Sequence, residues 1–102
     1  MSPTEVHNTL PTYTKTTFLI AAQAQNSNCI CLTKNRSYTA PIGMTVKDDL
    51  RNGARGIDEW VTLDGGNAYV LKNFQWITVG YNPQNGTSAT QLYIEFDTYI
   101  CK

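Results

Sequence analysis

The strongest constraint on the fold is an alternation of apolar and polar side chains near the carboxyl end of the chain. Between residues 91 and 100, one row of side chains is largely apolar, and the intervening row carries two tyrosines and two carboxylates. A period of two is typical of a β-strand that packs one face on a core. The alternation therefore predicts a half-buried strand over residues 91–100.

Shorter segments with strand-like composition precede it, and we expect strands at 17–23, 29–33, 38–40, 57–63, 68–71 and 74–81. Turn-forming residues separate them at 26–28, 34–37, 64–67 and 82–86, of which Asp-Gly-Gly-Asn at 64–67 is the strongest hairpin signal. One helical turn is expected over 46–52, capped by Thr45 and closed by Gly53. The sequence thus predicts an all-β fold, a small antiparallel β-sandwich or Greek-key barrel of about seven strands with one short helical turn.

The domain organisation expected from the sequence is simple. Residues 1–16 contain two prolines and many threonines, a composition that favours an extended N-terminal arm over a helix. The remaining residues, 17–102, are short enough to form a single β-rich domain around a thin core.

The charge content restricts the partners that the protein can have. Charged residues make up 16% of the chain and the formal net charge is zero, without the basic cluster that binding to a phosphate backbone requires. Nucleic acid is therefore an unexpected partner, and no apolar run approaches the roughly 20 residues of a membrane span. The first residues lack the features of a secretory signal, so the chain is either cytosolic or cleaved before this numbering begins. The compartment is unknown, and a virion or extracellular location is favoured over a cytoplasmic housekeeping role.

Three cysteines leave three alternatives open. Cys29 and Cys31 are two apart, so both thiols project from the same face of a strand, and Cys101 is the penultimate residue. Either member of the pair could form a disulfide with Cys101, or all three could be reduced. A metal site would need a fourth ligand, and the only histidine, His7, lies in a polar N-terminal stretch. We expect no metal and no cofactor.

The sequence contains no recognisable catalytic group. Any catalytic triad would depend on His7, and the paired acids Glu95 and Asp97 are expected to be solvated on an exposed sheet face. We therefore expect a protein that is not an enzyme.

Surface recognition is the remaining class of function. Four aromatic residues are predicted to lie on the strand faces opposite the aliphatic rows and to form a binding surface, although the alternative is that they pack in the core: Trp60, Trp76, Tyr93 and Tyr99. Asn35 and Asn85 begin tripeptides of the glycosylation acceptor pattern in predicted loops.

Two functions from different classes follow. The first is a structural protein of a larger particle, such as a phage or virus capsid, tail or decoration layer, which contacts other protein subunits, mainly copies of itself, through β-edges and the arm. The alternative is a secreted lectin-like or toxin-like binding module that uses the exposed aromatic face, with carbohydrate as its partner.

Overall fold

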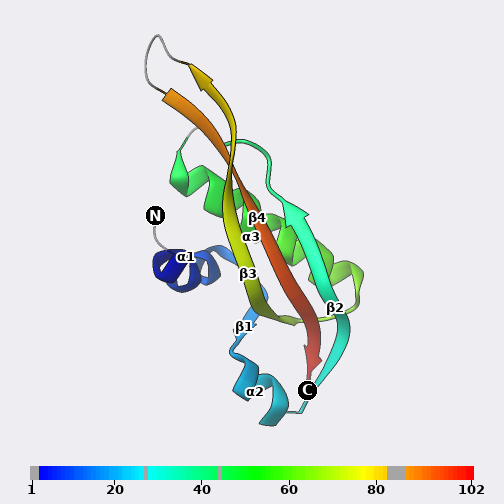
Figure 1. Cartoon of the computed structure of the whole chain (residues 1–102). Coiled ribbons are helices and arrows are strands. Elements are labelled where there is room, and N and C mark those ends of the chain that lie inside the picture. The colour runs from blue at the N-terminus through cyan, green and yellow to red at the C-terminus, as the bar shows by residue number, and fades with distance from the viewer. Residues whose placement is uncertain (1–2, 27, 44, 83–86) are drawn as a thin grey trace.

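The chain forms one mixed four-stranded sheet (Figure 1). The computed structural model describes residues 3–26, 28–43, 45–82 and 87–102. The strands are β1 (Thr17–Leu19), β2 (Cys29–Thr39), β3 (Ala68–Asn82) and β4 (Thr87–Cys101), and their order in the sheet is β1-β3-β4-β2. β1 pairs with β3 in parallel, and the other two pairings are antiparallel.

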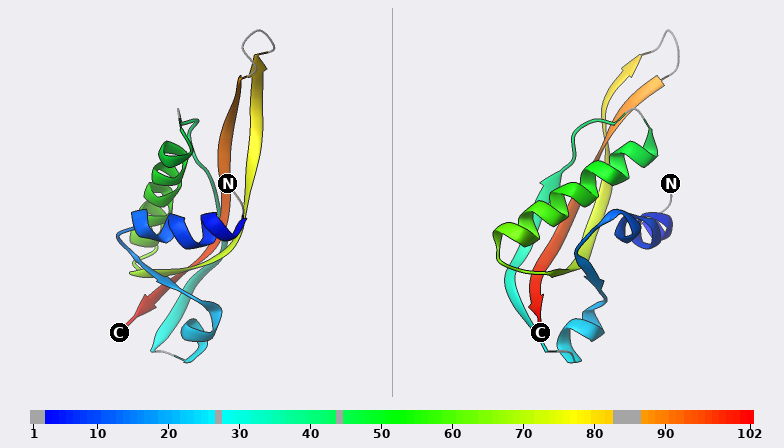
Figure 2. Two further views of the ribbon diagram at one scale, coloured as in Figure 1. Left: turned by 90° about the vertical axis from the view of Figure 1, so that its left-hand side faces the viewer. Right: turned by 180° about the vertical axis from the view of Figure 1, so that it is seen from behind.

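Helices lie mainly on one face of this sheet. The long helix α3 (Val46–Leu63) runs across that face, and α1 (Pro3–Thr9) and the 3₁₀ helix η1 (Leu10–Tyr13) lie beside it (Figure 2). The short helix α2 (Ala21–Asn26) follows β1 at the far end of the sheet. The prediction of an all-β sandwich or barrel of about seven strands is therefore wrong, because the chain folds as a small α/β domain.

The largest correction concerns residues 57–63, which were expected to form a strand but are the last two turns of α3. The buried residues Leu50, Ala54, Ile57 and Val61 follow a helical spacing of three and four, so they line one face of the helix. The predicted cap is confirmed, since the Asp48 amide donates to Thr45 Oγ1 at 3.1 Å. The helix then continues through Gly53 instead of ending there.

Two glycines explain how α3 approaches the sheet so closely. A Cβ on Gly53 would lie 2.8 Å from Ile94 Cδ1, and a Cβ on Gly56 would lie 2.2 Å from a ring carbon of Tyr38. Both glycines are therefore required by packing between helix and sheet rather than by a turn.

The first third of the chain also differs from expectation. Residues 3–13, predicted to be an extended arm, form α1 and η1, in which buried Leu10 joins the main core. Strand β1 ends at Leu19, and of the expected remainder of that strand, residues 21–23 form the start of α2. The segments 29–33 and 38–39 are parts of the one strand β2, which ends one residue before the expected end at Ala40. The turn predicted at 34–37 is a bulged region with Asn35 at a φ of 58°.

The alternation predicted for residues 91–100 is confirmed in β4 as far as Phe96, whereas Asp97, expected to be solvated, is buried and Ile100 is exposed. Leu92, Ile94 and Phe96 are completely buried beneath α3, and together with Tyr69 and Leu71 of β3 they form most of the sheet side of the main core. A smaller cluster under α2 covers one end of the opposite face and consists of Leu19, Ala24, Ala68 and Val70. Beyond that cluster, the opposite face is not covered by any element that the structure describes (Figure 2).

Candidate functional site

The four aromatic residues predicted to share a binding surface lie in different environments. Trp60 is on α3 and Trp76 on β3, and both side chains are half-buried against the core between helix and sheet. Tyr93 and Tyr99 are on β4 and point to the opposite face, where Tyr99 packs against the small cluster under α2. The fold therefore does not bring these four side chains together on one face.

The most extensive polar cluster joins β2 to the end of α3. Arg36 donates through Nε and Nη2 to the two carboxylate oxygens of Asp64, and its guanidinium carbon lies 4.2 Å from the centre of the Trp60 ring. Thr98 Oγ1 also donates to Asp64 Oδ2, at 2.7 Å. The hydrogen bond from Arg36 lowers the pKa of Asp64 below its ordinary value, and the same bond raises the pKa of Arg36. Both carboxylate oxygens of Asp64 are thus hydrogen-bonded, and the cluster ties β2 and β4 to the end of α3.

A second carboxylate anchors the bulged part of β2. Asp97 is buried, and its Oδ1 accepts the Asn35 amide at 2.8 Å, while Lys72 Nζ lies 3.8 Å from Oδ2. The Asn35 side chain is exposed and accepts from Lys72 Nζ at 3.3 Å. Asn35 thus lies in a strand bulge rather than in a loop, and Asn85, the other predicted glycosylation acceptor, lies outside the described residues.

His7 is surrounded by aromatic rings. Its ring centre lies 5.3 Å from that of Phe18 in an edge-on arrangement and 6.4 Å from that of Phe74. In the portion of the chain that the structure describes, no group of histidine, cysteine and carboxylate side chains is arranged to hold a metal ion. Within the same portion, none of the helices combines the length and the apolar character needed to span a bilayer.

The structure distinguishes between the alternatives for the three cysteines. Cys29 and Cys101 form a disulfide across β2 and β4, which closes a separation of 72 residues and confirms the predicted bond between the early pair and the chain end. Cys31 keeps a free, half-buried thiol and lies opposite Tyr99 in the same strand pair.

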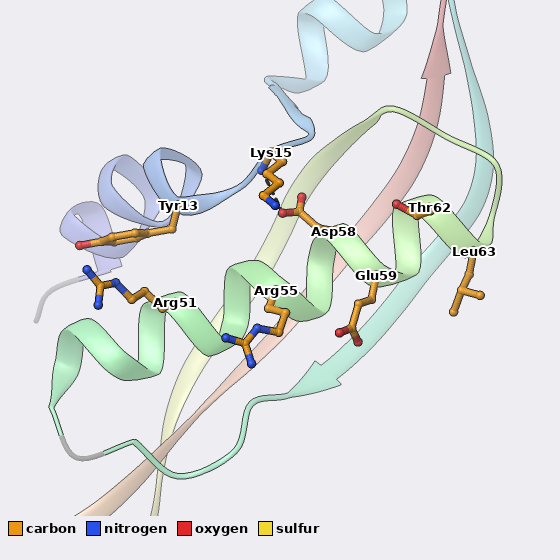
Figure 3. Close-up of a pocket in the computed structure, with 8 residues that line it drawn as sticks. All are labelled: Tyr13, Lys15, Arg51, Arg55, Asp58, Glu59, Thr62 and Leu63. Carbon is orange, nitrogen blue, oxygen red and sulfur yellow. Dashed lines mark hydrogen bonds between the residues drawn. The ribbon is translucent and has the colours of Figure 1, made fainter.

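A shallow hollow runs between α3 and the segment that follows η1 (Figure 3). It has a volume of about 790 Å³, and it is lined by Tyr13, Lys15, Arg51, Arg55, Asp58, Glu59, Thr62 and Leu63. Arg51 lies over the Tyr13 ring, with its guanidinium carbon 5.8 Å from the ring centre. Asp58 accepts the backbone amides of Lys15 and Thr16 at 2.9 and 3.0 Å, so this carboxylate fixes the segment beside the helix. The hollow carries charges of both signs.

The most unusual surface is the far end of the β3–β4 hairpin, which we call the ribbon and define as residues 77–82 and 87–91. The pairs in it run from Ile77 opposite Gln91 to Asn82 opposite Thr87. Near its base, Thr90 Oγ1 donates to the buried carboxylate of Asp49 on α3, at 3.3 Å. Beyond that contact the ribbon extends past the helix (Figures 1 and 2), and the molecule measures 54 × 25 × 20 Å.

The outer edges of the ribbon do not pair with any other strand that the structure describes. β1 pairs only with residues 68–70 of β3, and β2 ends opposite Tyr93 of β4, so no described strand borders the ribbon. The outer side of β2 is likewise an edge of the sheet. Because the Ala40 amide donates to the Leu92 carbonyl at 2.9 Å, the antiparallel alternation directs the backbone polar groups of Ser37 and Thr39 away from β4.

Sequence reasoning missed this surface, although a simple signal marks it. No aspartate, glutamate, lysine, arginine or histidine occurs in the 22 consecutive residues 73–94, which include both strands of the ribbon. Natural sheet edges are commonly protected from pairing with other chains by charged side chains. A count of charges along the predicted strands would have identified the ribbon as unprotected.

Comparisons of the chain with protein-family models, with curated protein sequences and with solved structures find no match.

Proposed function

We propose that this chain is a non-enzymatic assembly protein whose copies join through the ribbon and the free edge of β2. The observation that carries the proposal is the uncharged ribbon, which extends beyond α3 and whose outer edges pair with no other described strand. The setting that suits such a subunit is a larger particle, such as a phage or virus capsid, tail or decoration layer.

The physical reason lies in the stability of the ribbon. A two-stranded hairpin without a covering layer is marginally stable in water, and pairing along its edge adds hydrogen bonds and a second hydrophobic surface. Charged side chains would oppose that pairing through desolvation, and residues 73–94 contain none. A second copy of the chain is a suitable partner because antiparallel pairing of two identical edges is self-complementary.

The N-terminal segment does not provide the extended arm expected for such contacts, because α1 and η1 fold beside α3. The proposal therefore assigns the contacts to the ribbon and to β2. Carbohydrate recognition is less well supported than assembly, since the two tryptophans pack on the helix side of the sheet while Tyr93 and Tyr99 face the other way.

Light scattering coupled to size exclusion tests the proposal directly. We expect a species whose mass is a multiple of the 11.4 kDa chain and whose fraction grows with protein concentration. A monomer that persists at the highest soluble concentration would refute the proposal.

A matched pair of charge variants locates the interface. Thr78 is exposed on the ribbon, and Thr62 is exposed near the far end of α3. Thr78→Lys is expected to shift the protein to the monomer, because it places a charge on the edge that pairs, whereas Thr62→Lys is expected to leave the assembly intact. Equal behaviour of the two variants would exclude the ribbon as the contact surface.

A further inference from the structure

The pairing between β2 and β4 contains an offset of two residues. From Arg36 opposite Phe96 to Thr39 opposite Tyr93, the two strands pair without irregularity. At the other end of β2, Cys31 lies opposite Tyr99. β2 advances five residues from Cys31 to Arg36 while β4 advances three from Phe96 to Tyr99, so β2 carries two extra residues in its bulges.

Removal of these bulges would change the cysteine that faces Cys101. A regular ladder continued from the pair Arg36–Phe96 places the residue five positions before Arg36 opposite the residue five positions after Phe96. Those residues are Cys31 and Cys101. A shift of two residues keeps the cysteines on the same face of the sheet, because side chains alternate with a period of two.

The alternative pair would also have suitable geometry for a disulfide. Counting along the regular ladder from the hydrogen-bonded pair Ala40–Leu92, Cys31 and Cys101 fall at a pair without direct backbone hydrogen bonds. Cα atoms in such pairs lie about 4.5 Å apart, within the range of disulfide-bonded cysteines. The sequence of β2 is therefore compatible with a second register, which would place Cys31 instead of Cys29 opposite Cys101.

We propose that the protein interconverts between two disulfide isomers, Cys29–Cys101 with bulges in β2 and Cys31–Cys101 with a regular β2. Cys31 first releases its thiol proton to solvent, and its thiolate attacks Cys101 Sγ. The Cys31–Cys101 bond forms as the Cys29–Cys101 bond breaks, and Cys29 leaves as a thiolate that takes up a proton. The exchange involves no net oxidation or reduction, so it requires no external oxidant.

Local contributions to the free energies of the two registers oppose each other. The bulged register holds Asn35 at a φ of 58°, in the left-handed region that asparagine tolerates better than most residues but that β-branched residues avoid. The hydrogen bond from the Asn35 amide to Asp97 compensates for the cost of this conformation. The regular register relieves the backbone and restores the ladder, but it releases that hydrogen bond.

The exchange also changes the edge of the sheet. A bulged edge strand resists pairing with another chain, and a regular one favours it. The Cys31–Cys101 isomer is therefore the one with the more competent β2 edge. That consequence rests on the proposed assembly role, whereas the isomerisation itself does not.

Thiol labelling and mass spectrometry test the isomerisation in the wild-type chain. The protein is equilibrated at about pH 8.5, near the ordinary thiol pKa, then acidified and treated with N-ethylmaleimide. After reduction of the disulfide, trypsin releases a peptide, residues 16–34, that contains both early cysteines, and fragment ions between them locate the label. We expect the label on Cys31 in one population and on Cys29 in the other, and a label confined to Cys31 at all times would overturn the proposal.

A matched pair of substitutions tests the role of the bulge. Asn35→Gly and Asn35→Val both remove the amide side chain, but glycine accepts a positive φ and valine does not. The ratio of Cys31–Cys101 to Cys29–Cys101 is expected to be at least about fivefold higher in Asn35→Val than in Asn35→Gly. Equal ratios would show that the bulge does not control the pairing.

Variants that each lack one of the two early cysteines provide a test that does not depend on the behaviour of Asn35. Cys31→Ser can form only the observed disulfide with Cys101, and Cys29→Ser can form only the alternative one. Under the same air oxidation, both variants are expected to lose two hydrogens in intact mass. Oxidation of Cys31→Ser alongside a fully reduced Cys29→Ser would refute the second register, and this outcome is independent of the oligomeric state.

Discussion

Replacement of Gly56 by alanine measures how closely α3 packs on the sheet. A Cβ at this position would lie 2.2, 2.4 and 2.5 Å from three atoms of the Tyr38 ring. Carbon atoms that are not bonded attract each other best at about 3.5–4.0 Å, so either the ring or the helix must move. At Gly53 the nearest atom is Ile94 Cδ1 at 2.8 Å, which is the end of a flexible side chain.

The expected magnitudes differ between the two glycines. Alanine is favoured over glycine inside a helix by about 1 kcal/mol, and overpacking of a filled core costs about 1–3 kcal/mol. At Gly56 the clash involves a rigid ring, so Gly56→Ala is expected to lower the free energy of unfolding by about 1–2 kcal/mol. At Gly53 the neighbour can turn away, so Gly53→Ala is expected to be close to neutral.

Urea unfolding followed by circular dichroism measures both effects. A loss of 1 kcal/mol corresponds to a fall of about 4–8 °C in the melting temperature of a domain of this size. A double-mutant cycle with Tyr38→Ala identifies the cause. If the clash with the ring is responsible, Gly56→Ala should lower the free energy of unfolding much less in the Tyr38→Ala background than in the wild type. A Gly56→Ala protein more stable than wild type would refute the close packing.

Three further predictions concern the disulfide, an ion pair and a buried phenol. Cys101→Ser is expected to lower the free energy of unfolding by about 4 kcal/mol, because the disulfide closes a loop of 72 residues, and a loss below about 1 kcal/mol in urea unfolding would contradict this. The hydrogen bond from Arg36 lowers the pKa of Asp64. The stability that this ion pair contributes is therefore present above pH 3.8, the ordinary pKa of the carboxyl, and is lost as the pH falls through the lower pKa of the folded state. Asp64→Asn should flatten this acid dependence, and parallel curves of stability against pH would refute it. Burial raises the pKa of Tyr69 to about 12. The contribution of the neutral phenol to the free energy of unfolding is therefore present below pH 10 and is lost as the pH rises towards 12. Tyr69→Phe should remove one late-titrating phenol from an ultraviolet titration and reduce the loss of stability at alkaline pH, and an unchanged titration would count against the burial.

The part of the fold that could be predicted is the part that contacts a single covering layer. β4 shows a clear alternation because α3 buries Ile94 and Phe96 on one side while most of the other side faces water. In α3 the signal was present but was interrupted by glycine. Gly53 at the end of one helical turn resembles a helix terminus, and only the contact with Ile94 distinguishes a packing glycine from a capping one.

The surfaces were less predictable because they depend on pairing between distant residues. The disulfide to Cys101 was one of three alternatives that the cysteines left open, and the choice between Cys29 and Cys31 depends on bulges that local sequence does not reveal. The aromatic surface was inferred from strand alternation, and that inference failed at Trp60 because the residue lies on a helix. The ribbon could have been recognised from its missing charges, but its projection depends on the length of α3.

The length of α3 explains why none of the described helices covers the ribbon. α3 has 18 residues and therefore spans about 27 Å, whereas each strand of the hairpin has 15 residues and spans about 50 Å. A single helix of this size covers about half of the hairpin even when the two are aligned. β1 has three residues and β2 stops at Thr39, so neither neighbour extends the sheet beside the outer part. The backbone groups along the outer ribbon must therefore bind water or another chain, and the absence of charged residues from 73 to 94 favours another chain.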